Sequence, residues 1–264
     1  MPGFYAHHRF GKAALTHLPP DLQAVCQNYR AQFDIGLQGP DLFFFYKPLA
    51  ANRVVKYGHH LHKISAYPFF EHALSVIERT GVDSGAYAYL LGFICHFILD
   101  SQCHGYVNEM VSEIGVSHLE IEEEFEKHLL RADGAHPLAF PIYDLVPQDR
   151  ETAEAIALFY EGITPKIAER ALADLRRVKR FFTAPGVLKQ NFINGGMRLS
   201  GKHYSSLKGL MNQRKDNPKC AQTSEALFEL FSEAVPLAAV MMESFDDSLR
   251  TGKQLAKRFD RNFE

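Results

Sequence analysis

Residues 83–104 read DSGAYAYLLGFICHFILDSQCH, and this stretch decides the fold. It opens with Asp83 and Ser84, two residue types that cap helix N-termini, and Gly105, of a type that often follows a helix end, comes directly after it. Between these signals apolar residues would fall on every face of a helix with 3.6 residues per turn, which is typical of a fully buried helix. We therefore predict one long central helix that ends at His104.

Polar side chains interrupt this apolar stretch at single-turn spacing. His96, Asp100 and His104 lie four positions apart, so they form one slowly drifting stripe along the helix. Burying an imidazole or a carboxylate without a partner costs several kcal/mol, so something must satisfy these groups. A single histidine on an apolar face is usually a hydrogen-bonded core residue, and this alternative stays open for the stripe alone.

A second pair of ligand-type residues follows in a shorter amphipathic segment. Ser117 and Glu120 form a capping box, which predicts that a helix begins in SHLEIEEEFEKHLL, residues 117–130. His118 and Glu122 share its apolar face, so packing the two helices together would bring five ligand-type side chains into one pocket. The other charged residues are interpreted as pointing elsewhere, most simply as a solvated face: Glu120, Glu123, Glu124, Glu126 and Lys127.

The rest of the chain is also helical in pattern. Apolar periodicity predicts helices over residues 150–161, 164–182, 204–213 and 222–258, with Pro165 at a start and Pro236 at a kink. Stretches 34–48 and 183–202, rich in Gly, Pro and Asn, are predicted to be long ordered loops. No strand-like alternation of useful length and no internal repeat competes with this interpretation. We predict a single all-α domain, a multi-helix bundle over residues 1–264.

The histidines are distributed unevenly along the chain. Twelve of the 13 lie between His7 and His136. Because imidazole is the commonest metal ligand and a frequent acid or base, the chemistry is expected in residues 1–130. Residues 131–264 are expected to be helical scaffold.

Composition bounds the class of protein. A net charge of −2 gives no global drive toward nucleic acid, and no stretch resembles a secretory leader or a membrane span. The four cysteines form no CxxC pair, so neither a disulfide framework nor a thiolate zinc site is indicated. We expect a cytoplasmic protein with reduced thiols. The sequence does not indicate an oligomeric state.

The ligand types narrow the metal. Imidazole and carboxylate without thiolate suit zinc, with iron or manganese as alternatives, and disfavour calcium and magnesium. The Glu-x-x-His motif of di-iron bundles, the H-E-x-x-H motif of zinc proteases and a His-Asp dipeptide are all absent. Hydrolysis by more than one zinc ion is the favoured remaining chemistry.

The order of five motifs resembles a known family. MPGFYAHHRFG, GLQGPDLFFFY, GHHLH followed by FF, CHFILDSQCH and SHLEIEEEF, in residues 1–130, are similar to the cytoplasmic branch of the bacterial zinc-dependent phospholipase C family. The resemblance implies an all-α fold and a trinuclear zinc centre, both shared with single-strand-specific zinc nucleases. The ligands it implies are His7, Asp41, His62 or His59, His96, Asp100, His104, His118 and Glu122.

Roles and departures also follow from this resemblance. It implies that Asp41 is a ligand and the candidate general base, and that Asp100 bridges two metals. The family's mature chains begin with a Trp whose amine binds zinc, whereas this sequence has no Trp. Removal of Met1 would expose the Pro2 amine for that role. We predict two zinc ions, and a third if Pro2 takes part.

The expected reaction is hydrolysis of a phosphodiester by a metal-activated water, with Asp41 orienting or deprotonating that water. The partner is then a small phosphoester or a phospholipid headgroup. RRVKRFF, residues 176–182, could meet phosphates or lipid headgroups, and DLFFFY, residues 41–46, could contact acyl chains or stacked bases. Basic residues near a helix end are expected from the helix dipole, so the structural explanation is favoured for RRVKRFF. DLFFFY is equally open to core packing around the Asp41 turn. A zinc nuclease and a non-catalytic metal-stabilised helical protein are the alternative functions.

Overall fold

The computed structural model describes residues 3–263, and within this range the regular structure is helical, with no strand. The α-helices are α1 (Phe4–Leu15), α2 (Pro20–Asn28), α3 (Arg30–Gly36), α4 (Arg53–Lys63), α5 (Tyr67–Thr80), α6 (Gly85–Ile114), α7 (His118–Ala132), α8 (Arg150–Ala157), α9 (Pro165–Phe182), α10 (Val187–Arg198), α11 (Tyr204–Leu207) and α12 (Ala221–Thr251). The 3₁₀ helices are η1 (Gly39–Phe45), η2 (Ile142–Leu145), η3 (Gly201–His203), η4 (Lys208–Leu210), η5 (Pro218–Cys220) and η6 (Lys257–Phe259). The all-α prediction is confirmed.

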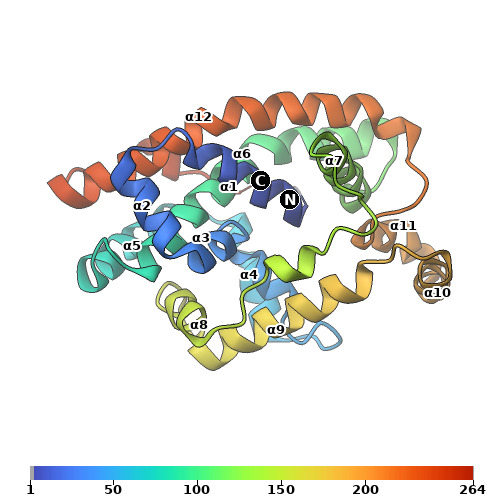
Figure 1. The fold of residues 1–264 in the computed structure, drawn as a ribbon, viewed down its shortest axis with the longest axis horizontal. Helices are drawn as coiled ribbons and strands as arrows, with labels where there is room; N and C mark the ends of the chain where they lie inside the picture. The colour runs from blue at the N-terminus through green and yellow to red at the C-terminus, as the bar shows by residue number, and fades with distance from the viewer. Residues whose placement is uncertain (1–2, 264) are drawn as a thin grey trace.

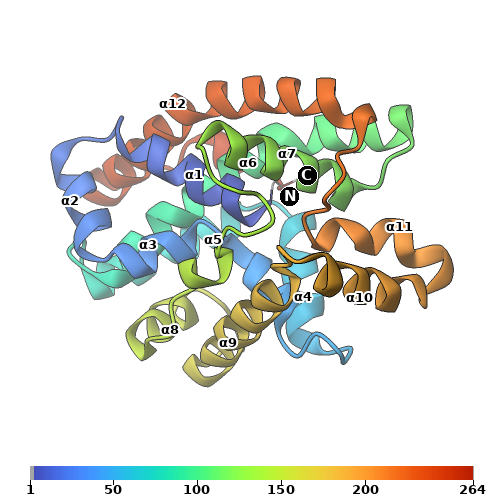
Figure 2. The same ribbon diagram turned by 45° about the vertical axis from the view of Figure 1, so that its right-hand side comes forward.

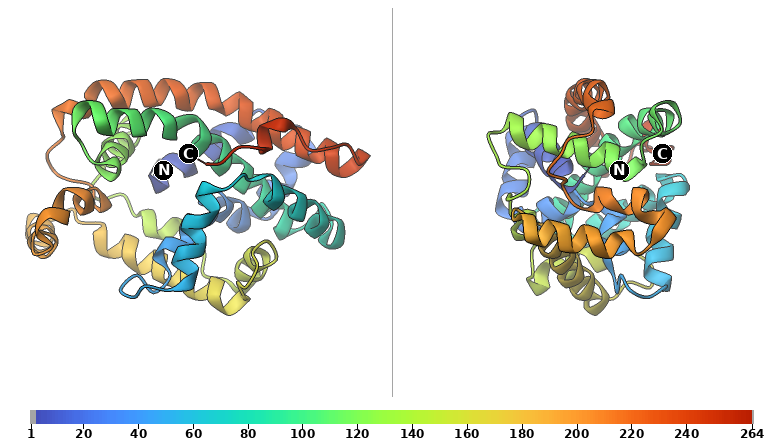
Figure 3. Two further views of the ribbon diagram at one scale, coloured as in Figure 1. Left: turned by 180° about the vertical axis from the view of Figure 1, so that it is seen from behind. Right: turned by 90° about the vertical axis from the view of Figure 1, so that its right-hand side faces the viewer.

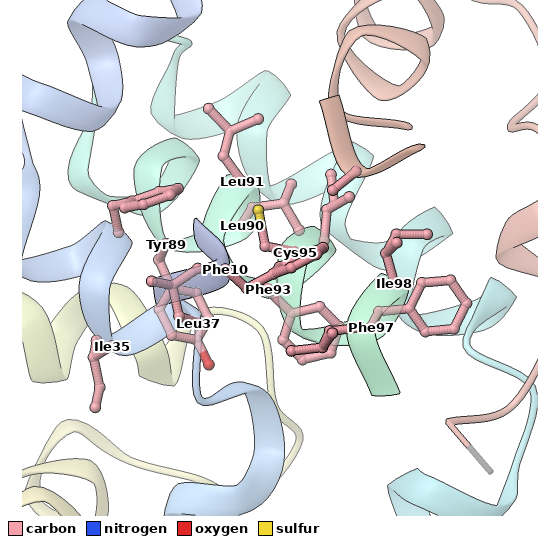
Figure 4. Packing of buried hydrophobic residues seen from close by; sticks show 14 of the residues in the cluster. Phe10, Ile35, Leu37, Tyr89, Leu90, Leu91, Phe93, Cys95, Phe97 and Ile98 are labelled. Atoms are coloured by element: carbon pink, nitrogen blue, oxygen red, sulfur yellow. The ribbon is translucent and has the colours of Figure 1, made fainter. Parts of the chain in front are cut away.

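The two longest helices lie side by side. Figure 1 shows α12 along one edge of the molecule with α6 next to it, and α9 along the opposite edge. Figure 3 gives the same arrangement from behind and from one end. Nearly all buried apolar side chains belong to one continuous core around α6. Figure 4 shows part of that core, with Phe93 of α6 near Phe10 and Leu37 and with Phe97 further along the helix beside Ile98.

The central helix forms where the sequence predicts it and runs further. Ser84 is the N-cap, and its side-chain oxygen accepts the backbone N–H of Tyr87 at 3.2 Å. The helix continues past Gly105 because Val107 and Met110 keep its apolar period and are buried. It ends at Gly115, whose φ of 66° is the left-handed conformation that favours glycine. The prediction that the helix ends at His104 is wrong.

Glycine allows α3 to cross α6 at backbone contact. A Cβ on Gly92 would lie 2.3 Å from the Phe33 carbonyl oxygen, and a Cβ on Gly36 would lie 2.2 Å from that of Tyr89. No larger residue fits at either position without moving a helix. This close crossing sets the chain that leaves α3, including η1, directly beside the middle of α6.

Several local predictions need correction. Residues 183–202 are not a loop, because α10 occupies most of them and buries Gln190 and Ile193. Residues 34–48 hold the end of α3 and the whole of η1. The helices predicted over 150–161 and 204–213 are shorter than expected, ending at Ala157 and, with η4, at Leu210. Helix α12 passes through Pro236 and ends before Gly252 instead of reaching residue 258.

The C-terminal segment returns to α4. Phe263 donates its backbone N–H to the His62 carbonyl oxygen at 3.3 Å, and Ala66 donates to the Arg261 carbonyl oxygen at 2.8 Å. The Phe263 ring is buried, with its centroid 5.1 Å from that of His62 and 5.7 Å from that of His96. The far end of the chain therefore covers one side of the candidate ligands. Within residues 3–263, none of the helices is long and apolar enough to cross a bilayer.

Candidate metal centre

Asp100 lies at the centre of a buried group of imidazoles. His7 of α1 places Nε2 3.2 Å from Asp100 Oδ1, and His96, one turn earlier on α6, places Nε2 3.4 Å from Asp100 Oδ2. His62 of α4 approaches the same oxygen to 4.0 Å. All four side chains are buried. Helices from three parts of the sequence thus aim their ligand atoms at one carboxylate.

Hydrogen bonds to backbone carbonyls fix the orientation of two of these rings. His62 Nδ1 lies 2.8 Å from the Gly58 carbonyl oxygen, and His96 Nδ1 lies 3.3 Å from that of Leu37. Because a carbonyl only accepts, both Nδ1 atoms carry the proton, and Nε2 faces the carboxylates. His62 Nε2 is 2.8 Å from Asp41 Oδ1. Lone pairs on both atoms would repel, so a proton or a metal cation belongs between them.

The buried polar atoms at the centre lack hydrogen bonds. Within residues 3–263, both ring nitrogens of His7, His96 Nε2 and both oxygens of Asp100 have no hydrogen-bond partner. Unsatisfied groups of this kind are rare in buried positions and costly. A divalent cation bound between them would supply the missing interactions at one carboxylate and two imidazoles. The residues present therefore fit a metal, and their oxygen and nitrogen donors suit zinc.

A further group of potential ligands, on α6 and α7, adjoins the residues around Asp100 and Asp41. His118 Nε2 lies 2.7 Å from Glu122 Oε1 at the start of α7, and the ring centroids of His104 and His118 are 5.3 Å apart. His104 Nδ1 is 3.8 Å from Asp100 Oδ2, so the groups are continuous. The side-chain sets whose ligand atoms lie close enough to hold one ion are His7, His96 and Asp100; Asp41, His62 and His96; and His104, His118 and Glu122.

Burial and neighbouring charge set the protonation of these groups. Burial holds the pKa of His96 well below its ordinary value and lowers the pKa of His104 to about 4. Burial alone would raise the pKa of Asp100, but the imidazoles around it, His96 first, hold that pKa well below its usual range. At neutral pH these side chains are therefore neutral imidazoles and an ionised carboxylate, which is the form that binds metal.

Asp41 and His62 behave as a pair. Burial raises the pKa of the Asp41 carboxyl, and its hydrogen bond to His62 opposes that rise. Burial alone would lower the pKa of His62, but the same hydrogen bond raises it above its ordinary value. One proton shared by the two groups gives the metal-free pair its attraction. Because that proton occupies the same position as a cation would, metal binding at this pair displaces it.

Some of the sequence-predicted residues lie outside these groups. His59 is exposed on α4 and stacks on Phe44, with ring centroids 4.3 Å apart, so of the two alternatives the structure brings His62 to the other ligands. His8, next to His7, turns away and places Nδ1 3.8 Å from Asp34. Pro2, whose amine was a candidate ligand, lies outside the described residues.

The face of α7 that was predicted to be solvated is buried. Glu123 accepts the backbone N–H of Gln213 at 2.7 Å, and Glu124 accepts that of Asn217 at 2.6 Å. Lys127 is fully buried, with Nζ 3.0 Å from a carboxylate oxygen of each glutamate. Glu120 accepts from Asn217 Nδ2 at 2.7 Å. The interpretation of these residues as solvent-facing is wrong, because residues 208–217 cover them.

The predicted capping box at the start of α7 does not form. Ser117 is the N-cap, but its side chain caps no backbone N–H there. Its hydroxyl instead donates to the Ser205 carbonyl oxygen at 2.8 Å. Tertiary contact with α11 has replaced the local hydrogen bond, while the helix still begins at the predicted place.

A cavity of about 830 Å³ opens beside the ligand groups. His62, His104, His118 and Glu122 contribute to its wall, so the metal-binding atoms face an accessible space. Much of the remaining wall is apolar: Phe44, Phe45, Pro48, Leu49, Leu119, Val178, Phe181, Phe182 and Leu210. A cavity of this size and lining can hold a sizeable apolar ligand with its polar end at the ligand groups.

The second half of the chain forms part of this site as well as the scaffold. Arg177, Phe181 and Phe182, from the RRVKRFF segment, line the cavity, and Arg177 also pairs with Asp174 at 2.9 Å. A smaller space of about 100 Å³ adjoins it, with Asp41, Glu122, Glu126 and Lys179 among its lining residues. The sequence signal for these contributions was the aromatic and basic composition of residues 176–182.

The helical fold carries three adjoining groups of side chains that could hold metal ions, next to a largely apolar cavity. The sequence profile of the family described as zinc dependent phospholipase C matches residues 6–161, which is more than half of the chain. The chain belongs to the zinc-dependent phospholipase C family. The match extends beyond residues 1–130, where the motifs suggested it. Neither the curated proteins nor the solved structures include a match to this chain.

Proposed function

We propose that this protein is a zinc-dependent phosphodiester hydrolase acting on the headgroup linkage of a phospholipid. The observation that carries the proposal is the position of His62, His104, His118 and Glu122 in the wall of an 830 Å³ largely apolar cavity, where His62 and His104 adjoin the buried Asp100 carboxylate. Apolar walls accommodate acyl chains, while the charged phosphodiester lies against the ligand groups. Membership of the zinc-dependent phospholipase C family supports the same substrate class.

The residues of the chain suit this reaction. Zinc, when bound by these ligands, supplies a water of lowered pKa and neutralises phosphoryl charge. Asp41 has a buried carboxylate that lines the smaller space of about 100 Å³, so it can orient that water and accept its proton. In the metal-free protein the shared proton holds Asp41 against His62 at 2.8 Å, and a cation bound between them would take over that role. The Phe263 ring, packed behind His62 and His96, excludes water from the far side of the ligands.

The cavity wall favours a lipid over a nucleic acid. Single-strand binding sites combine stacking aromatic rings with a basic groove along the phosphate backbone. Here the aromatic rings are present, but Lys63 and Arg177 are the only lysine and arginine among the described residues that line the cavity. Comparing phosphatidylcholine hydrolysis with single-stranded DNA cleavage distinguishes the two substrates. Preferential cleavage of the DNA would replace the lipid proposal with the nuclease alternative.

The reaction is tested with Asp100→Asn. This change removes the central charge while keeping the shape of the side chain, so we expect bound zinc to fall and hydrolysis of bis(p-nitrophenyl) phosphate to drop by about 100-fold or more. Asp144→Asn is the matched control, because Asp144 is exposed, pairs with Arg176 and belongs to none of the ligand groups found among the described residues. Unchanged turnover in Asp100→Asn would refute the proposed chemistry. Zinc binding without turnover in the unaltered protein would favour a non-catalytic metal-stabilised role.

We also propose a cytoplasmic location, supported by the four cysteines, all free and buried. External protease applied to intact cells should then leave the protein uncut, whereas lysed cells should lose it. Cleavage in intact cells would contradict this location.

A further inference from the structure

Helix α10 exposes an apolar stripe. Leu188 and Phe192 are one turn apart, and Leu199, directly after the helix, falls on the same side at 3.6 residues per turn. They are exposed by 87%, 75% and 90%. On the opposite side Ile193 is buried and packs with Met211. The helix is therefore anchored by one face and leaves a second apolar face in solvent.

Positive charge surrounds this stripe. Lys189 lies beside it on one side and Arg198 on the other, and α10 contains no acidic residue. The wider segment of residues 183–220 has seven lysines and arginines and a single acidic residue, although the whole chain has a net charge of −2. Exposed apolar residues flanked by basic residues characterise helices that lie in the interface of an anionic bilayer.

The same segment is attached to the rim of the cavity. Phe182 and Leu210 both belong to the cavity wall, and α10 and α11 lie in the chain between them. Figure 2 shows α10 and α11 together at one end of the molecule, beyond the end of α9. Half-exposed Phe181 and fully exposed Leu49 also line the cavity. Exposed apolar side chains are thus present both on α10 and at the cavity to whose wall its segment is attached.

We propose that α10 is an interfacial anchor that docks the protein on an anionic phospholipid bilayer. Leu188, Phe192 and Leu199 enter the boundary between headgroups and acyl chains, while the flanking basic residues meet the headgroup phosphates. The helix lies on the bilayer without crossing it. The further claim that docking brings the cavity to its lipid rests on the proposed function. The docking itself does not depend on that function.

Charge favours this occupant over a second copy of the chain. In a symmetric dimer the same patch faces itself, so Lys189 and Arg198 would meet like charges across the contact. No acidic side chain of α10 is present to compensate them. An anionic surface satisfies both the basic and the apolar residues of the stripe.

The test is binding of the full-length protein to sedimented vesicles. Vesicles of phosphatidylserine and phosphatidylcholine in a ratio of about 1:2 should retain the protein, and salt should weaken the binding. The double variant Leu188→Ser/Phe192→Ser should bind about tenfold or more weakly, because it removes two interface-burying side chains. Val240→Ser, an equally conservative change at an exposed position of α12, should bind like the unaltered protein.

The outcomes separate this inference from the proposed reaction. Circular dichroism and zinc content should be unchanged in the double variant, because neither altered residue lines the cavity or belongs to the ligand groups. Failure of the unaltered protein to bind vesicles, or equal binding by the double variant, would overturn the inference. So would a dimer in sedimentation velocity that the double variant dissociates. Vesicle binding without hydrolysis of bis(p-nitrophenyl) phosphate would instead sink the proposed function and leave the anchor standing.

Discussion

Gly39 shows how a single residue shapes the candidate centre. Its φ of 48° lies in the left-handed region, and a Cβ at this position would lie 2.2 Å from His96 Cδ2. The turn that begins here carries Asp41 to the ligand group. Glycine is required both by the backbone conformation and by the space that the His96 ring occupies.

We predict that Gly39→Ala lowers the free energy of unfolding by about 2–4 kcal/mol, from left-handed strain and overpacking together. The amount of zinc retained per chain should also fall, because the added methyl group pushes the His96 ring away from the turn that carries Asp41. The control is Gly105→Ala within α6. Apart from the adjacent backbone of its own helix, an added Cβ there meets nothing within 4 Å among residues 3–263, so the change should stabilise the protein by about 0.5–1 kcal/mol. Urea denaturation measures both. Equal effects of the two changes would show that the contact with His96 does not constrain residue 39.

Single substitutions also test whether His59 or His62 is the metal ligand on α4. His62→Ala should weaken zinc binding by about tenfold or more, because it removes a buried imidazole from the group with Asp41 and His96. His59→Ala should keep its zinc, because that ring is exposed and stacks on Phe44. Titration with a competing chelator measures both affinities. A larger loss in His59→Ala would mean that the other histidine is the ligand.

Sequence reasoning reached these residues only in part. The four-residue spacing of His96, Asp100 and His104 showed that they share one face, because α-helix geometry is regular. In α4, by contrast, His59 and His62 are one turn apart, and both line the cavity. The hydrogen bond from His62 to Gly58 and the stacking of His59 on Phe44 are what separate them in the structure. Neither contact leaves a signal in the local pattern.

Helix α7 uses both of its sides. One side holds His118 and Glu122 at the cavity, and the other binds residues 208–217 through Glu123, Glu124 and Lys127. In sequence, a lysine three and four positions after two glutamates is typical of a solvated helix. The error came from tertiary contact, since the chain that covers this side lies about 90 residues further on.

The buried ions of α7 lead to a stability prediction. Lys127→Met should lower the free energy of unfolding by about 3–5 kcal/mol, because it leaves Glu124 without its buried cation and removes the hydrogen-bonding partner of Glu123, whose pKa burial already raises to about 8. Lys166→Met, at an exposed position of α9, should change it by less than about 0.5 kcal/mol. Chemical denaturation of both variants provides the comparison. A neutral effect at Lys127 would mean that water or a shared proton already satisfies the glutamates.

Whole elements were predictable where their own sequence determined them. The apolar surround of α6 and the cap at Ser84 gave its start correctly, since both act within the helix. Helix α10 was missed because Gly195 and Gly196 lower helix propensity, while burial of Ile193 against Met211 stabilises it. The length of α6 was underestimated because Gly105 interrupts the pattern without ending the helix.

At the scale of the whole molecule, the candidate centre depends on the complete fold. Its ligands come from α1, η1, α4, α6 and α7, and Phe263 closes it from the C-terminal end. An unfolded chain cannot bring these residues together, so metal affinity adds directly to folding stability. Like the fold class, the family was predictable from the sequence because its ligand-bearing motifs appear in order. The covering of α7 and the cavity wall from α9 required the tertiary structure.

Removing metal should therefore destabilise the entire protein, and the loss should depend on pH. With free zinc at about 100 times the dissociation constant, the loaded protein should gain about 2.7 kcal/mol over the chelated one. Zinc must displace the proton that His62 shares with Asp41, and because that hydrogen bond raises the pKa of His62 above its ordinary value, the gain should be largest near pH 8 and shrink as the pH falls through that raised pKa. His104, whose pKa burial lowers to about 4, should add a further loss only near that pH. Differential scanning calorimetry with and without chelator measures the difference. Restoring zinc should recover the melting temperature, magnesium should not, and Asp100→Asn should show a much smaller response. A melting temperature indifferent to chelation at every pH would mean that protons alone hold these buried groups together.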